Sequence, residues 1–212
     1  MAVEVYKEGA AEFHLPRSQH VFYNPRAKLG RDLGVLAMRV EAERLERPLE
    51  VLELMAGAGL RSKRYLTEAP VARMVVNDAN YESFSVLQQH VGDDPRVELH
   101  NELAQRLLSR FYLEERRFDW VDLDPFGTPA PYVPFVQGVI RWEGLFYVTA
   151  TDAPVLCGAQ RGESLNILDV RKNSEYYSEH VMDAENAPLD FINDSMAQVD
   201  KNKKYFVHCA GG

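Results

Sequence analysis

The chain has 212 residues, of which 46% are hydrophobic and 26% charged, and its formal net charge at pH 7 is -8. This length allows one sizeable core, or one core with a small appendage. The acidic total and a pI near 5.3 argue against indiscriminate binding to a phosphate backbone, although a local basic patch can coexist with them. No run approaches the roughly 20 apolar residues of a membrane span, and the first residues lack the features of a secretory signal. We therefore expect a cytoplasmic protein that binds no membrane.

The chain has two cysteines, Cys157 and Cys209. They exclude a disulfide framework and offer no Cys-x-x-Cys pair for structural zinc, so we predict reduced thiols and no metal site. Basic residues are scattered through the first third of the chain, where they form either an RNA-facing patch or an ordinary mixed-charge surface. These residues are Arg17, Arg26, Lys28, Arg31, Arg61, Lys63 and Arg64.

Between residues 49 and 152, short apolar runs alternate with longer amphipathic segments. This pattern is typical of a parallel sheet with helices on its faces. The predicted strands span residues 49–54, 72–77, 97–100, 118–123 and 145–149. The predicted helices span residues 60–68, 81–91, 102–115 and 132–141. Together they indicate the α/β class, with a doubly wound, mostly parallel, Rossmann-like sheet.

The character of the sequence changes near residue 162, where Gly158 and Gly162 punctuate a polar stretch. Beyond it, residues 165–170 and 205–209 are predicted strands, separated by an acidic stretch that is irregular or helical. A tail of this length is too short for an independent domain. We expect a core at residues 1–162 and a dependent segment at 163–212, whose two strands could extend the main sheet.

A glycine loop follows the first predicted strand of the core, in the sequence Glu-Leu-Met-Ala-Gly-Ala-Gly-Leu-Arg from Glu53 to Arg61. Gly57 and Gly59 let the backbone approach a nucleoside-bearing ligand, or they provide only a sharp exit from the strand. The third glycine of a dinucleotide fingerprint is missing, and Arg61 suits a carboxylate better than a pyrophosphate. S-adenosylmethionine, which has an amino-acid carboxylate and one ribose, therefore fits this loop better than NAD.

Two carboxylates follow later strands. Asp78 ends the second predicted strand, where it either accepts hydrogen bonds from ribose hydroxyls or caps the next helix. Asp122 and Asp124 lie on one face of a strand that Pro125 ends at the ligand-binding edge of the sheet.

The segment around Asp124 suits methyl transfer to a base. An exocyclic amine is a poor nucleophile, and Asp124 can hold its N–H and then take the released proton. Phe126 can stack the base, and Gly127 permits close backbone approach. Otherwise the segment is an ordinary turn, Asp122 a buried hydrogen-bonded carboxylate and Phe126 core filling.

Four separated blocks resemble the tRNA (guanine-N2-)-dimethyltransferases that modify guanine 26. They are Phe-Tyr-Asn-Pro-Arg from Phe22 with Arg31 and Asp32, the glycine loop, Asp-Leu-Asp-Pro-Phe-Gly-Thr-Pro from Asp122, and Thr-Asp-Ala-Pro-Val-Leu-Cys-Gly from Thr151. The resemblance implies that Asp124 is the catalytic carboxylate, that Phe22 and Phe126 embrace the guanine, and that Pro125 offers the amine a backbone acceptor. The predicted donor site comprises Arg31, Glu53, Gly57, Gly59, Arg61, Asp78, Glu102, Ala104 and Asp122.

In the family an acidic residue often precedes the alanine that corresponds to Ala104, where it reads the adenine amine. This chain has Leu103 there and Glu102 one place earlier. Family members also continue into a C-terminal domain that helps to hold tRNA, and nothing in this chain resembles that domain.

The last fifty or so residues instead resemble a rhodanese-type sulfurtransferase, through Asn-Ile-Leu-Asp-Val-Arg from Asn166, Glu-His-Val from Glu179, Ala-Pro-Leu from Ala187 and His-Cys-Ala-Gly-Gly from His208. The resemblance implies a persulfide-carrying thiol at Cys209. The chain stops at Gly212, inside the expected thiolate loop, so a buried inert cysteine is the favoured interpretation. Such a combination is a natural fusion, a fragment or a chimera.

Three functions follow, in decreasing order of support. The first is S-adenosylmethionine-dependent methylation of a guanine N2 amine in tRNA. The second is a donor-binding module that lacks competent catalysis because the RNA-holding part is missing. The third is a thiosulfate-handling enzyme built on Cys209.

Overall fold

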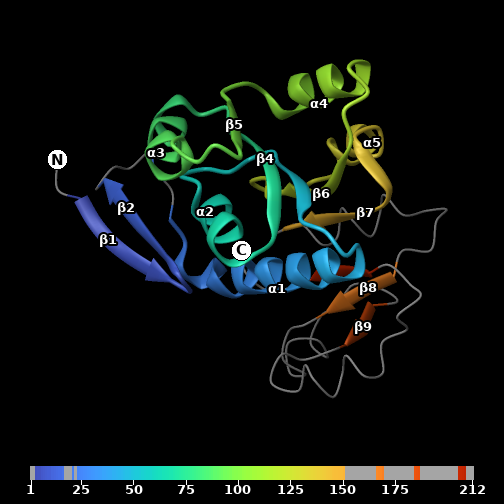
Figure 1. Cartoon of the computed structure of the whole chain (residues 1–212), viewed down its shortest axis with the longest axis horizontal. Coiled ribbons are helices and arrows are strands. Elements are labelled where there is room, and N and C mark those ends of the chain that lie inside the picture. The colour runs from blue at the N-terminus through green and yellow to red at the C-terminus, as the bar shows by residue number, and fades with distance from the viewer. Residues whose placement is uncertain are drawn as a thin grey trace.

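The five strands predicted from residue 49 onwards form one parallel sheet in the computed structural model, which describes residues 3–16, 21 and 23–150 and three short strands near the C-terminus. The sheet order is β5-β4-β3-β6-β7 (Figure 1). Its strands are β3 (Leu49–Glu53), β4 (Val71–Asn77), β5 (Val97–His100), β6 (Phe118–Leu123) and β7 (Ile140–Val148). Strand order reverses on the two sides of β3, so ligands are expected beyond its carboxyl end. The predicted Rossmann-like sheet is confirmed.

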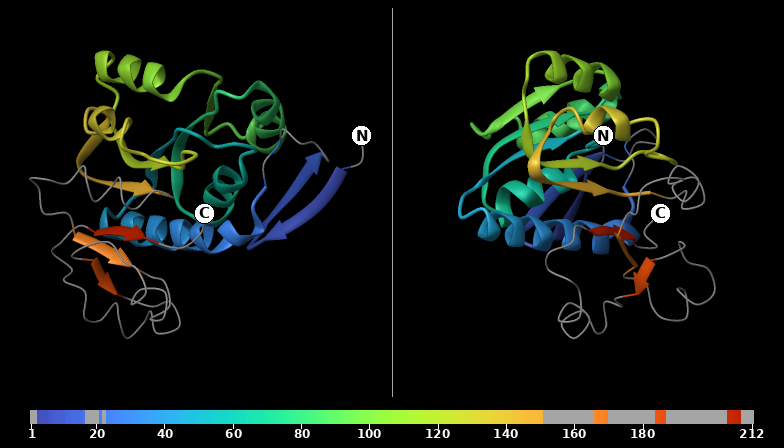
Figure 2. Two further views of the ribbon diagram at one scale, coloured as in Figure 1. Left: turned by 180° about the vertical axis from the view of Figure 1, so that it is seen from behind. Right: turned by 90° about the vertical axis from the view of Figure 1, so that its right-hand side faces the viewer.

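Helices cover both faces of this sheet (Figures 1 and 2). One face carries α1 (Lys28–Arg44), α2 (Leu60–Glu68) and α3 (Tyr81–Val91), and the other carries α4 (Ala104–Leu113) and the short α5 (Val133–Val136). Alternation along the strands divides the core between the two layers. In β3, for example, Val51 packs towards α1, α2 and α3, whereas Leu52 packs towards α4 and α5. No helix in the described part of the chain is long and apolar enough to cross a membrane.

The helix predicted at residues 132–141 is wrong. Only Val133–Val136 is helical, and β7 begins at Ile140. Gly138 follows shortly after this helix, and its N–H donates to the carbonyl of Phe135 in a tight turn. The pairing of Phe118 with Ile140 and then of Trp120 with Leu145 shows that β7 bulges beside β6. An amphipathic period across a short helix and a bulged strand resembles the period of one longer helix.

The N-terminal quarter of the chain contains elements that the sequence did not lead us to predict. Strands β1 (Val3–Glu8) and β2 (Ala11–Pro16) form an antiparallel hairpin, and a 3-10 turn (Pro25–Ala27) leads into α1. Alternating burial of Ala11, Phe13 and Leu15 places one face of β2 against α2, α3 and the glycine loop. This period of two beside a glycine turn was the available signal.

The C-terminal strands form a sheet of their own, in the order β10-β8-β9, with parallel pairing. They are β8 (Asn166–Asp169), β9 (Ala184–Asn186) and β10 (Tyr205–His208). The strands predicted at 165–170 and 205–209 are therefore present, and β9 was not predicted. The expectation that they extend the main sheet is wrong, because they pair with one another and with β9. The predicted boundary near residue 162 lies outside the described residues.

Candidate active site

Two aspartates and one arginine join the end of β6 to the start of α2. Nη1 of Arg61 lies 2.8 Å from Oδ1 of Asp122, and Nη2 lies 2.8 Å from Oδ2 of Asp124. One guanidinium reaches both carboxylates, so they point to the same side, as predicted, although Asp124 lies one residue beyond the end of β6. Asp122 is fully buried, whereas the side chain of Asp124 keeps 39% of its surface exposed. Asp124 is therefore the member of the group that a substrate can reach.

Two buried hydroxyl groups hold carboxylates in this part of the site. The hydroxyl of Tyr65 donates to Oδ2 of Asp122 at 2.6 Å, and the hydroxyl of Ser62 donates to Oε2 of Glu53 at 2.6 Å. Burial and the charge of Asp122 raise the pKa of Glu53 to about 8. Burial also raises the pKa of Asp122, against the opposing influence of Arg61. Glu53 is therefore mainly protonated at neutral pH, and Asp122 has both oxygens engaged, as the interpretation of a buried hydrogen-bonded carboxylate requires.

Phe126 lies two residues beyond Asp124 and is 88% exposed. The alternative that it fills the core is therefore wrong, because most of this side chain lies at the surface of the protein. Pro125 is buried between the two, and Gly127 has a φ of +89° with nothing within 4 Å of the position a Cβ would take. The turn thus presents Asp124 and Phe126 outward at the carboxyl edge of the sheet.

The two glycines of the loop differ in why they are needed. Both have positive φ, +56° at Gly57 and +77° at Gly59. A Cβ on Gly59 would lie 2.4 Å from Cδ1 of Leu87, so packing against α3 excludes a side chain there. No atom lies within 4 Å of a Cβ position on Gly57. Only Gly57 therefore leaves room for a ligand against the backbone.

Asp78 fixes this loop from the neighbouring strand. Its Oδ2 accepts the N–H of Gly57 at 2.7 Å, and its Oδ1 accepts the N–H of Asn80 at 2.8 Å. Burial raises the pKa of Asp78, and these two hydrogen bonds oppose that rise. The predicted alternative that Asp78 caps the helix is wrong, because Asn80 is the N-cap of α3. Each carboxylate oxygen of Asp78 retains a lone pair, so the group can still accept ribose hydroxyls.

The segment predicted to contact adenine begins at Glu102. Its carboxylate forms an ion pair with Arg110, and its main chain bonds to the side chain of Asn77. Leu103 is the N-cap residue of α4 and is 59% exposed, whereas Ala104 is buried in the core. Leu103 is thus the side chain that this segment presents to solvent.

Arg31 pairs with the hairpin. Its guanidinium donates to both carboxylate oxygens of Glu8, at 2.6 and 2.8 Å, and to the carbonyl of Asn24. Arg31, Arg61 and Arg64 are at most 7% exposed. These three arginines therefore belong neither to an RNA-facing patch nor to an exposed mixed-charge surface. Lys28 is exposed and pairs with Asp32, and Arg17 and the side chain of Arg26 lie outside the described residues.

The residues around the glycine loop fit a methyl donor with one ribose. Gly57 offers open space beside the backbone, and Asp78 offers acceptors on the adjacent strand. The guanidinium of Arg61 lies between this loop and Asp124 and can also meet a carboxylate. The types and the arrangement of these residues thus agree with S-adenosylmethionine as the methyl donor. Several supporting residues escaped prediction, although Tyr65 is four residues after Arg61 and so shares its helix face.

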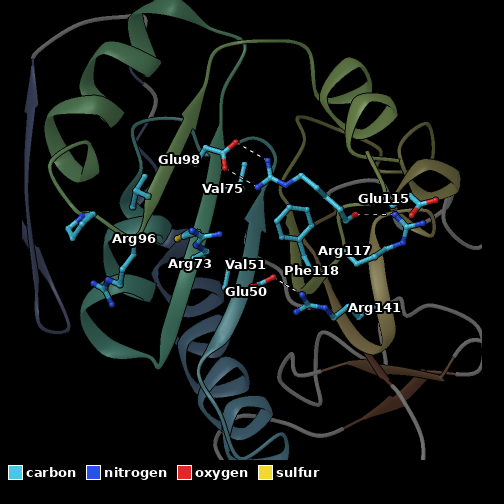
Figure 3. Close-up of a pocket in the computed structure, with 14 residues that line it drawn as sticks. Glu50, Val51, Arg73, Val75, Arg96, Glu98, Glu115, Arg117, Phe118 and Arg141 are labelled. Carbon is cyan, nitrogen blue, oxygen red and sulfur yellow. Dashed lines mark hydrogen bonds and ion pairs between the residues drawn. The ribbon is translucent and has the colours of Figure 1, made fainter. Parts of the chain in front are cut away.

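A separate cavity of about 400 Å³ lies at the opposite ends of the strands (Figure 3). It contains none of the predicted site residues. Arginines and glutamates line it, and many pair with one another, as Arg141 does with Glu50 and Arg116 with Glu98. These pairs satisfy the charges that a ligand would otherwise meet, so the candidate site is the carboxyl edge and not this cavity. Phe22, the Thr151–Gly158 block with Cys157, and Cys209 lie outside the described residues.

Comparison with known proteins identifies the same family over most of the length of this chain. A model of the family described as N2,N2-dimethylguanosine tRNA methyltransferase matches residues 2–180. The tRNA (guanine(26)-N(2))-dimethyltransferase of Thermococcus kodakarensis is 32% identical over 78% of this chain and 48% of its own length. The enzyme of the same name from Pyrobaculum neutrophilum is 37% identical, over 74% of this chain and 46% of its own length.

Solved structures agree. Trm1 from Pyrococcus horikoshii, in complex with S-adenosyl-L-methionine, superposes with a TM-score of 0.61 at 29% identity, covering 74% of this chain and 45% of that one. A tRNA m1G37 methyltransferase from M. jannaschii shares the fold, with a TM-score of 0.57 at 12% identity over 74% of this chain and 46% of that one. The chain spans about half the length of the curated relatives it matches. Because the family model matches most of its residues, the chain belongs to the N2,N2-dimethylguanosine tRNA methyltransferase family.

Proposed function

We propose that this chain is an S-adenosylmethionine-dependent methyltransferase that methylates the exocyclic N2 amine of guanine 26 in tRNA, in the cytoplasm. The observation that carries the proposal is that one turn holds both a partly exposed carboxylate, Asp124, and an exposed aromatic ring, Phe126. Both stand at the same edge of the sheet as the open side of Gly57. The relatives named for this reaction support the choice of substrate.

The chemistry assigned to the chain's own residues is positioning and proton acceptance. Arg61 holds Oδ2 of Asp124, and among the described residues no donor bonds to Oδ1. Oδ1 is therefore the atom proposed to accept an N–H of the guanine amine, which directs the nitrogen lone pair away from the carboxylate. Phe126 would hold the base by stacking. The donor supplies an electrophilic methyl group on a sulfonium, and Asp124 takes the proton that the amine loses.

Donor binding is assigned to the loop side of the site. We propose that Gly57 and Asp78 hold the nucleoside, together with Gly59 as the loop's second turn. We propose that Arg61 and Arg31 bind the donor's carboxylate. Each guanidinium would then bind this group in addition to the protein carboxylates that it already holds. We propose that Glu53 on β3, Ala104 on α4, Asp122 on β6 and Glu102, in the turn before α4, support the same site.

The test separates donor binding from methyl transfer. Calorimetry with S-adenosylhomocysteine measures the first, and incorporation of labelled methyl into a tRNA with guanine at position 26 measures the second. We expect binding and incorporation, with the label in N2-methylated guanine. Absence of binding would contradict the proposal at its foundation, and a methylated base other than guanine would contradict the substrate.

A second function is favoured by one observation, that the chain spans about half the length of its relatives. If these residues alone hold tRNA too weakly for methyl transfer, they act as a donor-binding module. Binding of S-adenosylhomocysteine with no tRNA product, unchanged by Asp124→Ala, would identify the module. Product formation that Asp124→Ala abolishes would exclude it.

The rhodanese-like segment at 163–212 remains a proposal. Parallel pairing of β8 with β10 supports an α/β character for this segment, and Cys209 follows the last residue of β10. We propose an inert thiol at Cys209. Mass spectrometry after thiosulfate treatment tests this, because addition of one sulfur atom at Cys209 would establish the sulfurtransferase alternative.

A further inference from the structure

His90 lies in the last turn of α3, between the glycine loop and the N-terminal hairpin. Its Nδ1 is 2.7 Å from the carbonyl oxygen of Ala58, and the backbone N–H of His14 points at its Nε2 from 3.1 Å. Phe13 meets the imidazole edge-on, with ring centroids 5.9 Å apart. The ring therefore touches both the loop and β2, two segments that lie far apart in the sequence.

The two partners assign the proton on the ring. A carbonyl can only accept, so Nδ1 carries the hydrogen and donates to Ala58. Nε2 faces both main-chain groups of His14, the N–H at 3.1 Å and the carbonyl oxygen at 3.2 Å, and in the neutral ring it accepts from the N–H. This is the neutral imidazole, and burial lowers the pKa of His90 in agreement with it. Both nitrogens are thus committed to backbone groups.

Ala58 is the residue between the two glycines with positive φ. Its carbonyl is held by His90, and Leu87, one turn earlier on the same face of α3, fills the space beside Gly59. Helix α3 thus fixes the loop at two successive points, through packing at Gly59 and through a hydrogen bond at Ala58. Asp78 fixes it at a third, through the N–H of Gly57.

We propose that His90 is a positioning residue that sets the conformation of the glycine loop for the methyl donor and ties that loop to the hairpin. The proposal deepens the proposed function and rests on it. The hairpin matters because Glu8, at the end of β1, accepts hydrogen bonds from Tyr23 and Arg31, which belong to the segment predicted to contact base and donor. His90 therefore joins the loop to the segment that carries the other half of the site.

Two substitutions separate the two hydrogen bonds. The amide of asparagine can place a donor near the position of Nδ1, whereas the longer glutamine can place an acceptor near Nε2. His90→Asn retains the bond to Ala58, and His90→Gln retains the bond to His14. The control is Gln89→Asn, because Gln89 directly precedes His90 on α3 and is exposed.

Calorimetry with S-adenosylhomocysteine and the thermal midpoint are measured for all four proteins. We expect His90→Gln, which loses the bond to the loop, to weaken binding about tenfold, and His90→Asn, which loses only the bond to the hairpin, to weaken it by less. A purely structural His90 would lower the thermal midpoint and leave affinity unchanged. Equal affinities in wild type and both variants, or equal weakening in both, would overturn the proposal. Absence of binding by the wild-type chain would instead overturn the proposed function.

Nitrogen NMR of the His90 ring gives a second readout that does not depend on donor binding. The expected spectrum at neutral pH is that of the neutral imidazole with hydrogen on Nδ1. Hydrogen on Nε2 would overturn the proposal, because Nδ1 could not then donate to Ala58.

Discussion

Arg61 holds Asp124 through a hydrogen bond of 2.8 Å, although the sequence assigns Arg61 to the donor and Asp124 to the base. The same guanidinium donates to Asp122, which Tyr65 holds from the other side. The two halves of the proposed site therefore meet in one side chain. A change in Arg61 is expected to alter both donor binding and the orientation of the catalytic carboxylate.

Replacement of Arg61 by lysine tests this link. Lysine keeps the charge but cannot bridge two carboxylates as the planar guanidinium does, so Asp124 loses its fixed orientation. We expect methyl transfer in single turnovers to fall by up to about 100-fold. Arg64→Lys is the control, because Arg64 is buried on the same helix but pairs with Asp32 and Glu68. An equal loss in both variants would show that burial, and not the link to Asp124, is responsible.

Replacements of Asp124 and Asp78 are expected to separate catalysis from donor binding. Asp124→Asn removes the proton acceptor and should lower methyl transfer by about 100-fold or more, with donor affinity nearly unchanged. Asp78→Ala removes the acceptor that holds Gly57 and should weaken S-adenosylhomocysteine binding by about tenfold or more. The exposed Asp93 provides the control, Asp93→Asn. The reverse pattern would mean that the two roles have been exchanged.

The two glycines of the loop should respond differently to alanine. Gly59→Ala places a Cβ against Leu87 in a left-handed conformation, so it should destabilise the fold by more than the roughly 1–2 kcal/mol of the conformation alone. Gly57→Ala meets no atom and should cost only that amount, but it should weaken donor binding by crowding the open side of the loop. Urea unfolding and calorimetry measure the two effects. Partial recovery of stability in Gly59→Ala with Leu87→Ala would identify the contact.

Glu53 should make stability depend on pH. Its pKa of about 8 in the folded chain lies above the ordinary value of 4.5, so protonation favours the fold. The contribution is complete below pH 4.5 and is lost as the pH rises towards 8, at up to about 1.4 kcal/mol per pH unit. Glu53→Gln can still accept from Ser62 and should lack this slope. Urea unfolding of both proteins between pH 5 and 8 checks it, and parallel curves would contradict the assignment.

Much of the central sheet follows from the sequence because buried parallel strands are short apolar runs that contrast with the helices between them. Strands at residues 97–100 and 118–123, and helices at 60–68 and 81–91, have the predicted bounds. The helix predicted at 132–141 is wrong because the segment divides into a very short helix, which contains Pro134, and a bulged strand that begins two residues after Gly138. The hairpin and α1 were missed because glycines and charged residues interrupt their apolar pattern.

The candidate site divides in a similar way. The shared face of Asp122 and Asp124 follows from the period of a strand, and the structure brings both to Arg61. The pairing of Arg31 with Glu8 and the hydrogen bond of His90 to Ala58 could not follow, because these residues are separated by 23 and 32 positions. Contacts between distant segments depend on packing that no local pattern contains.

The hydroxyl of Tyr147 donates to the carbonyl of Gly30 at 2.7 Å, across 117 positions of the chain. Helix α1 is thus bonded to β7, the last strand of the main sheet to leave the ribosome. During synthesis this helix emerges long before the strand that it must meet, so its final docking is a late event. Nascent chains that end before β7 should therefore leave α1 accessible to proteases, although all of its own residues have already been made.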